Sequence, residues 1–202
     1  MLRARWLVLV VIVGACGKEP AKAVPVPETP PTPRLSEAEV TARNTLAITE
    51  RGAAFELADG AHRVTITLPQ RPTIDNQTMR ESGVAVFNSQ AIMPGGPVDA
   101  QFGVATVLDD MLPPAMMDQM SAVPEQLAAA AGGSLAANQA STLVGHPGRS
   151  FEIKTSDGRR LFGWYVAVAE HARVYQLNCV GPEGDATRAA CGAIMASLKL
   201  AP

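Results

Sequence analysis

Apolar and polar residues alternate along several short stretches of this chain, which is the period of a half-buried β-strand. Within residues 62–68, the apolar Val64, Ile66 and Leu68 alternate with polar residues. A second strand-like run covers residues 53–58. The Asp59-Gly60 pair between these runs is typical of a tight hairpin turn. Further strand-like runs are found at residues 84–92, 98–108, 150–154, 162–168 and 173–180. Because consecutive runs are joined by short turns, they predict an antiparallel sheet.

Two segments before the last third of the chain have helical signals instead. One begins at Ser36, a favourable N-cap followed by acidic residues, and is expected to end before Gly52. The other covers residues 113–131 and ends at a pair of glycines. Pro124 lies inside it, which predicts either a kink or two short helices, the second of them capped by Ser121.

A final helix is predicted to begin at an Asp185 cap and to run to about Leu198. At helical spacing, one stripe of it is formed by Cys191, Ile194, Met195 and Leu198. The sequence therefore predicts an α+β fold, in which helices cover the apolar faces of an antiparallel sheet. We expect residues 36–202 to form a single globular domain.

Composition narrows the class of protein. Of the 202 residues, 47% are hydrophobic and 18% are charged, which is too apolar for a disordered chain and sufficient for one domain with a core. The formal net charge of −2 argues against a nucleic-acid-binding protein, whose affinity depends on a basic surface. Three cysteines are too few for a disulfide scaffold.

The N-terminus has the features of an export signal. Arg3 and Arg5 precede an apolar run over residues 6–13, which is far shorter than the ~18 residues of a membrane-spanning helix. The small residues that end in Cys16 resemble the lipobox of bacterial lipoproteins. That resemblance implies removal of residues 1–15 as a signal peptide and lipidation of Cys16. An ordinary signal peptide or a stray hydrophobic stretch is the alternative.

Lipidation would fix the chain to a membrane, because each buried acyl methylene contributes ~0.8 kcal/mol. In the lipoprotein family, Gly17 after the cysteine favours the outer membrane, facing the periplasm. Residues 17–35 hold six of the sixteen prolines and predict an extended polyproline II tether that reaches about 60 Å. A proline-rich ligand for another protein is the alternative interpretation. Residues 16–35 are thus expected to separate the membrane from the domain.

The C-terminal half resembles a known superfamily. The loop over residues 145–149 leads into a strand, an aromatic strand ends near Val168, residues 174–177 form the next strand, and a helix closes at residues 196–200. This order resembles the PsbP/Mog1-like superfamily, including bacterial DcrB-like domains. The resemblance implies an antiparallel sheet sandwiched between helices (an αβα sandwich). It also implies an accessory, binding or assembly role, and it assigns no catalytic residue.

Two cysteines remain besides Cys16. Cys179 lies on a predicted strand and Cys191 on the helix expected to pack against it. An exported chain meets an oxidising compartment, so we expect these two cysteines to form a disulfide, which would stabilise the fold by ~3 kcal/mol. Two buried free thiols are the alternative.

Motifs for catalysis or metal binding were not found. His62, His146 and His171 lack metal-ligand spacing, and Asp109-Asp110 is better interpreted as a helix cap. There is no G-x-S-x-G nucleophile elbow and no glycine-rich phosphate loop. The sequence therefore indicates no cofactor and no metal.

The sequence favours a non-enzymatic lipoprotein that is anchored in the bacterial cell envelope and binds another envelope protein. The alternative is a small-molecule or lipid-binding lipoprotein with a pocket between sheet and helix. Met117, Met120 and Trp164 are the candidate lining of that pocket. An enzyme whose polar groups are assembled only by the fold is the third hypothesis.

Overall fold

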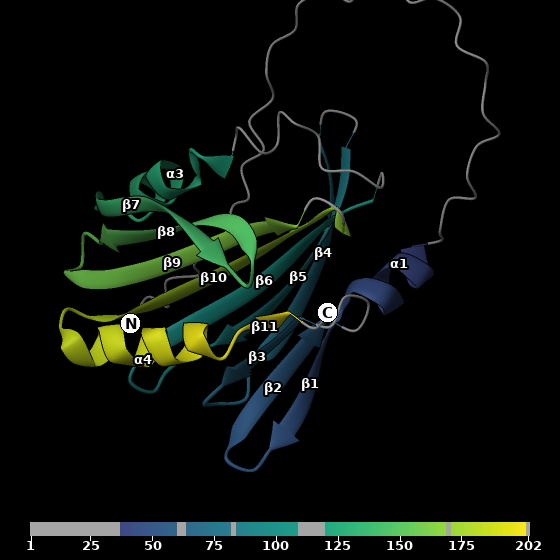
Figure 1. Ribbon diagram of the computed structural model, residues 1–202, viewed down its shortest axis with the longest axis horizontal. Helices are drawn as coiled ribbons and strands as arrows, with labels where there is room; N and C mark the ends of the chain where they lie inside the picture. Colours follow the sequence, from purple (N-terminus) through teal and green to yellow (C-terminus); the bar gives the residue numbers. More distant parts are fainter. Residues whose placement is uncertain (1–36, 60–63, 82–83, 109–119, 169–170, 201–202) are drawn as a thin grey trace, which may run out of the picture.

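The computed structural model describes residues 37–59, 64–81, 84–108, 120–168 and 171–200. Its helices and strands are shown in Figure 1. In chain order they are α1 (Glu37–Asn44), β1 (Leu46–Arg51), β2 (Ala54–Asp59), β3 (Val64–Leu68), β4 (Thr73–Glu81), β5 (Val84–Met93), β6 (Asp99–Val107), α3 (Val123–Ala130), β7 (Ser134–Leu143), β8 (His146–Lys154), β9 (Arg159–Val168), β10 (Arg173–Pro182), α4 (Asp185–Ala196) and β11 (Lys199–Leu200). The antiparallel α+β fold expected from the sequence is confirmed.

The strands form two antiparallel sheets. The larger has the order β4-β5-β6-β10-β9-β8-β7, and the smaller has the order β1-β2-β3-β11. In the larger sheet β10 inserts between β6 and β9, so the C-terminal hairpins join the N-terminal ones. In the smaller sheet β11 pairs with β3, so the last described residues lie beside a strand from the first third of the chain (Figure 1).

The larger sheet separates two apolar clusters. The smaller sheet and α4 pack on one face, where Phe162 and Val166 of β9 are buried. On the opposite face, Tyr165 and Ala167 of the same strand belong to the cluster that includes α3. This division follows directly from the strand period of two, because successive side chains of β9 point to opposite faces. The small second sheet was not foreseen by the sequence analysis.

The first helix is shorter than predicted. α1 ends at Asn44, and residues 46–51 form strand β1 instead of continuing the helix to Gly52. The Asn44 side chain donates a hydrogen bond to the Val40 carbonyl at 2.7 Å. The backbone N–H of Leu46 then donates to Ser89 Oγ at 3.0 Å rather than to a helical carbonyl. The backbone N–H of Thr45 still donates to the Thr41 carbonyl, and the helix stops there because the next N–H, that of Leu46, is bound by β5.

The second and last helices differ from the prediction at their starts. α3 begins after Ala122, whose side chain forms no capping bond, so the prediction that Ser121 caps it was wrong. Residues 113–119 lie outside the described part of the chain. α4 begins after Gly184, which makes Asp185 its first residue rather than its cap. The predicted end of α3 is correct, since Gly132 has φ +58° and leads the chain out of the helix.

Candidate functional sites

The proposed membrane anchor cannot be compared with the structure. Cys16, the signal peptide and the proline-rich tether all lie in residues 1–36, outside the described part of the chain. Among the helices that the structure describes, none is both long enough and apolar enough to cross a bilayer. Lipidation of Cys16 stays a prediction.

The predicted disulfide between Cys179 and Cys191 is confirmed. The two Cα atoms are 5.7 Å apart, and both residues are fully buried in the cluster beneath α4. The bond links the centre of β10 to the middle of α4. It therefore holds the helix against the face of the larger sheet.

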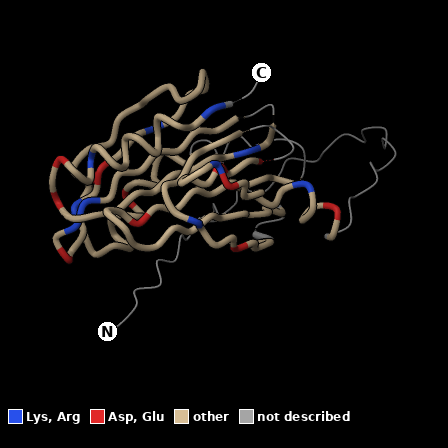
Figure 2. The backbone as a smooth tube through the Cα atoms, turned by 90° about the horizontal axis from the view of Figure 1, so that it is seen from below, with Lys and Arg blue, Asp and Glu red and all other residues tan. Residues whose placement is uncertain are grey.

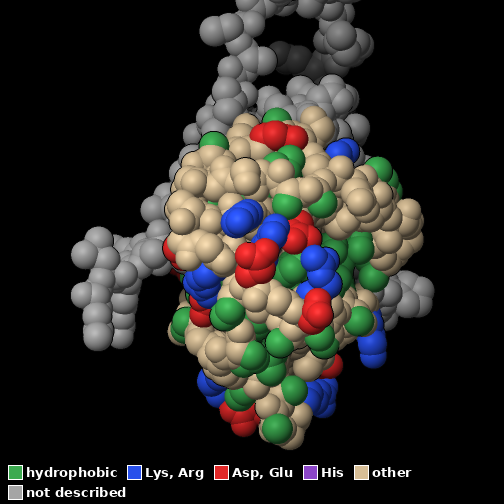
Figure 3. Space-filling model, turned by 90° about the vertical axis from the view of Figure 1, so that its left-hand side faces the viewer, with side chains coloured by type: hydrophobic (Ala, Val, Ile, Leu, Met, Phe, Trp, Pro, Cys, Tyr) green, Lys and Arg blue, Asp and Glu red, His purple; other side chains and the backbone are tan. Residues whose placement is uncertain are grey.

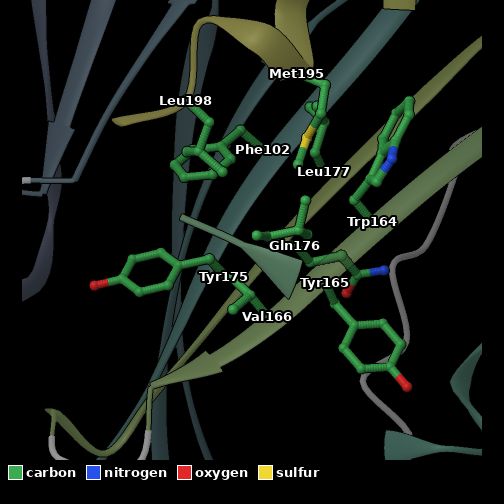
Figure 4. Close-up of a pocket in the computed structure, with 10 residues that line it drawn as sticks. Phe102, Trp164, Tyr165, Val166, Tyr175, Gln176, Leu177, Met195 and Leu198 are labelled. Atoms are coloured by element: carbon green, nitrogen blue, oxygen red, sulfur yellow. The ribbon is translucent and has the colours of Figure 1, made fainter. Parts of the chain in front are cut away.

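A small apolar depression lies beside the end of α4, against the face of the larger sheet (Figure 4). We refer to it as the Trp164 depression. Its lining includes Trp164 of β9, Leu177 of β10, and Met195 and Leu198 at the end of α4. The free space inside it is only ≈ 10 Å³, which is room for about one water molecule. Pockets for small-molecule ligands are usually about 300 Å³ or larger.

The pocket proposed from the sequence does not form as expected. Met120 belongs to the cluster on the α3 face, where its carbonyl accepts a 2.5 Å hydrogen bond from the Tyr165 hydroxyl. Trp164 packs against the cluster on the other face. The sheet thus separates these two residues, because Trp164 and Tyr165 are successive in β9. Met117 lies outside the described residues, and α4 supplies the methionine beside Trp164, namely Met195.

Burial also changes the chemistry of the tyrosine on the α3 face. Desolvation raises the pKa of Tyr165 to about 12, so its hydroxyl stays protonated and donates to the carbonyl of Met120. This contact fixes the start of the α3 segment against β9. The role of Tyr165 in this arrangement is structural.

A network of ion pairs joins β8, β9, α4 and the turn between β10 and α4 at one end of the molecule. Arg160 of β9 contacts Glu152 of β8 at 3.2 Å and Glu183 at 2.5 Å. Arg188 of α4 contacts the same Glu152 at 3.0 Å and lies 4.8 Å from the centre of the Phe162 ring. We call these residues the Arg160 cluster. The hydrogen bond from Arg160 holds the pKa of Glu183 below its usual value.

The Arg160 cluster carries equal numbers of positive and negative groups. Basic and acidic residues are accordingly interspersed along the backbone at this end of the molecule (Figure 2) and on its surface (Figure 3). A cluster balanced in this way has no excess charge with which to attract a phosphate or a nucleic acid. The Arg160 cluster instead fastens α4 to the strands that α4 crosses.

A second polar cluster is buried where the two sheets meet. Arg173 at the start of β10 forms an ion pair with Asp59 at the end of β2, with exposed side-chain fractions of 2% and 0%. Arg173 Nη2 also donates to Asn44 Oδ1 at 2.5 Å, and the Tyr175 hydroxyl donates to Asp59 Oδ2 at 3.1 Å. Burial, together with the negative charge of Asp59, raises the pKa of Tyr175. We call these four residues the Arg173 cluster, and it ties α1 and the smaller sheet to the larger sheet.

The described histidines form no evident metal centre. His146 begins β8 and His171 precedes β10, and both are half-buried. Within the described residues there is no group of three or more His, Cys, Asp and Glu side chains that could hold a metal ion. His62 lies outside these residues.

Comparison with known proteins identifies the fold and nothing finer. No protein-family model matches the chain, and no curated protein matches it. The chain is similar to the solution structure of cyanobacterial PsbP (CyanoP) from Synechocystis sp. PCC 6803, with a TM-score of 0.52 and 11% sequence identity. The likeness covers 75% of this chain and 95% of that one.

The chain therefore has a PsbP-like fold, as the resemblance in its C-terminal half implied. An identity of 11% shows a shared architecture, and a fold alone does not determine function. The narrower likeness to DcrB-like and Mog1-like domains stays a prediction.

Proposed function

We propose that this protein is a lipid-anchored, non-enzymatic lipoprotein of the bacterial cell envelope whose domain binds another envelope protein. The observation that carries the proposal concerns the three cysteines of the chain. Two of them, Cys179 and Cys191, form a buried disulfide, a bond that persists in oxidising compartments such as the periplasm. The third, Cys16, ends the lipobox-like segment and is the residue that lipoproteins modify.

The tether supports a role at a distance from the membrane. Residues 17–35 would separate the lipidated Cys16 from the domain by about 60 Å if fully extended. An anchored domain on such a spacer reaches partners near the membrane while its own diffusion is confined to the surface. The resemblance to lipoproteins favours the outer membrane and the periplasmic side.

The Trp164 depression is the surface that best fits a protein partner. Tryptophan and methionine are enriched at protein interfaces, and Trp164 and Met195 lie together there. About 10 Å³ of free space is too little for a lipid or a metabolite, whereas the half-buried Trp164 and Met195 offer apolar surface on which a partner can pack. Binding of protein is therefore favoured over the carriage of a small molecule.

Lipidation is tested by labelling. The full chain is produced in a Gram-negative bacterium fed with labelled palmitate, together with Cys16→Ser and, as a matched control, Cys191→Ser. We expect label in the unchanged chain and in Cys191→Ser, and none in Cys16→Ser. An unlabelled wild-type chain, or label retained by Cys16→Ser, would contradict the proposed anchor.

Partner binding is tested by crosslinking in intact cells, followed by affinity purification of the full chain from the membranes. We expect a distinct envelope protein with the wild-type chain and a smaller yield of it with Trp164→Ala. Thr78→Ala, an exposed position of β4, serves as the control and keeps the full yield. Thermal unfolding shows that each variant is folded. Repeated recovery of no partner, or an unchanged yield with folded Trp164→Ala, refutes the binding role of this surface.

A further inference from the structure

Strand β7 forms one edge of the larger sheet, and among the described residues it pairs with β8 alone. Its ten residues, SLAANQASTL, include no charged side chain and no proline. Natural edge strands are usually protected by charge, proline or brevity, because their free backbone groups are a template for another strand. The opposite edge, β4, has such protection, since it includes the exposed carboxylate of Asp75. The β7 edge is long and uncharged.

The turn that ends β7 is also unusual. Val144 and Gly145 join β7 to β8 with φ of +47° and +88°, the conformation for which hairpins normally use Asn-Gly. Valine is unfavourable there, because a β-branched residue with positive φ is strained. Val144 is also the one large hydrophobic residue exposed in the described part of the chain, at 37%. A strained, exposed apolar side chain therefore marks the end of the unprotected edge.

The register of the hairpin indicates which backbone groups of β7 point outward. Leu143 and His146 flank the two-residue turn, so they form a hydrogen-bonded pair, and such pairs alternate along an antiparallel ladder. Thr142 faces Pro147, a residue without an N–H, which agrees with this alternation. By the same rule, the N–H and C=O groups of Asn138 and Ala140 are directed away from β8, as those of Thr142 are.

The regular part of β7 is symmetric about Ala140. A bulge interrupts the pairing between Leu135 and Ala137, and the turn ends the strand at Leu143. Residues 137–143 are therefore the straight segment, and Ala140 is at its centre. The outward-directed residues lie at the same distances on either side of this centre.

We propose that β7 pairs antiparallel with β7 of a second copy of this chain, with Ala140 on the two-fold axis. The two larger sheets then become one continuous sheet. In this register Ala140 meets the partner's Ala140, and the outward groups of both strands form hydrogen bonds with each other. In the dimer, the β7 strands of the two copies therefore cover each other's free backbone groups.

The side chains fit this register. Leu143 lies opposite the partner's Ala137, and Gln139 lies opposite the partner's Ser141, so that on this face a larger residue meets a smaller one. Val144, in the turn, lies close to the partner's Ala136, the extra residue of the bulge. Because β7 contains no charge, the two-fold axis brings no like charges together. This self-complementarity is what favours a second copy over the strand of a different protein.

The proposal is tested on the full chain purified in detergent. Ala140→Cys places two thiols beside each other across the axis, and we expect a disulfide-linked dimer on a non-reducing gel. The control is Thr78→Cys in the other edge strand β4, which has the same Cys16 and is expected to stay monomeric. Equal crosslinking of the two variants would overturn the proposal.

Two further variants separate association from folding. Ala140→Lys puts two positive charges opposite each other across the axis and is expected to weaken the dimer about fivefold or more in sedimentation equilibrium. Because Ala140 also lies opposite Arg149 of its own chain, thermal unfolding measures separately how much the variant destabilises the fold. Val144→Asn relieves the strained turn, so we expect a more stable fold together with a weaker dimer. A wild-type chain that is monomeric at all concentrations, or a dimer unaffected by Ala140→Lys, contradicts the proposed pairing. Neither result depends on lipidation or on an envelope partner.

Discussion

The Arg173 cluster permits a quantitative test of how the two sheets are held together. Asp59→Asn removes the charge of Asp59 with almost no change of shape. Arg173, with 2% of its side chain exposed, would then lose the negative charge that it faces. The side chains of Asn44 and Tyr175, which also contact it, are neutral. Breaking a buried ion pair from one side costs about 3–5 kcal/mol. That is a large fraction of the about 5–15 kcal/mol that stabilises a typical domain.

The free energy of unfolding is measured by urea titration followed by circular dichroism. The matched control is Glu50→Gln, which breaks the pair between Glu50 and Arg71. Their side chains are 65% and 64% exposed, and a pair so exposed contributes less than about 1 kcal/mol. We therefore expect Asp59→Asn to lower the unfolding free energy by several times as much as Glu50→Gln does.

A double-mutant cycle shows whether the loss comes from the pair itself. Arg173→Met leaves Asp59 as the unpaired charge, and Asp59→Asn/Arg173→Met leaves no charge at all. The double variant is expected to be more stable than the sum of the single losses predicts, with a coupling of about 2–3 kcal/mol. Additive losses, or a cost of Asp59→Asn no greater than that of Glu50→Gln, would refute the claim that a desolvated ion pair joins the sheets.

Three other outcomes are expected from variants of the domain. Cys191→Ala removes the disulfide to Cys179, which closes a loop with a sequence separation of 12. We expect the unfolding free energy to fall by about 3 kcal/mol in thermal or urea titrations, and no loss would contradict the stabilising role of the disulfide. Gly163→Ala places a Cβ 2.0 Å from the Phe151 ring and costs about 1–3 kcal/mol, so an unchanged melting temperature would show that the ring moves freely. Asp99→Asn lowers stability at neutral pH by about 0.5 kcal/mol. Burial alone would raise the pKa of Asp99, but its hydrogen bonds and the charge of Arg159 outweigh this effect and hold the pKa below the ordinary 3.8. The stability difference between the wild type and Asp99→Asn must therefore shrink as the pH falls below about 4 and through the folded-state pKa. A constant stability difference across that range would refute this origin.

The sequence predicted the strands whose apolar residues alternate clearly. Residues 64–68 became β3, in which buried and half-buried residues alternate. Residues 162–168 became part of β9, which is buried on both faces but has its larger aliphatic residues, Val166 and Val168, on the same face as Phe162 and Trp164. The disulfide was also predictable, since Cys179 and Cys191 each lie on the apolar side of neighbouring elements. In these cases the local sequence pattern already indicates which side chains are buried in the folded protein.

The edge strands β4 and β7 were not predicted. Seven of the nine residues of β4 and half of those of β7 are polar, because an edge strand packs against few neighbours and needs little apolar surface. Residues 46–51 were assigned to a helix for a different reason. The contact of Leu46 with Ser89 that ends α1 joins positions 43 residues apart, and no local pattern reports such a contact.

The polar clusters and the lining of the Trp164 depression could not be predicted without knowledge of the topology. Arg173 and Asp59 are 114 residues apart in the chain, and nothing near either residue indicates its partner. Similarly, a methionine beside Trp164 was expected from the middle of the chain, whereas α4 supplies it. The alternation within β9 places Trp164 and Tyr165 on opposite faces, but it does not say which helix covers which face.

The pairing of β11 with β3 has a consequence for the order in which this protein acquires its structure. Lys199 lies opposite Thr65, and the Ser197 hydroxyl accepts a hydrogen bond from the backbone of Thr67 across 130 residues. A polypeptide that leaves a ribosome or a membrane pore amino end first holds β1, β2 and β3 long before their last neighbour arrives. Completion of that sheet must wait for release of the whole polypeptide, and such distant contacts make folding slow.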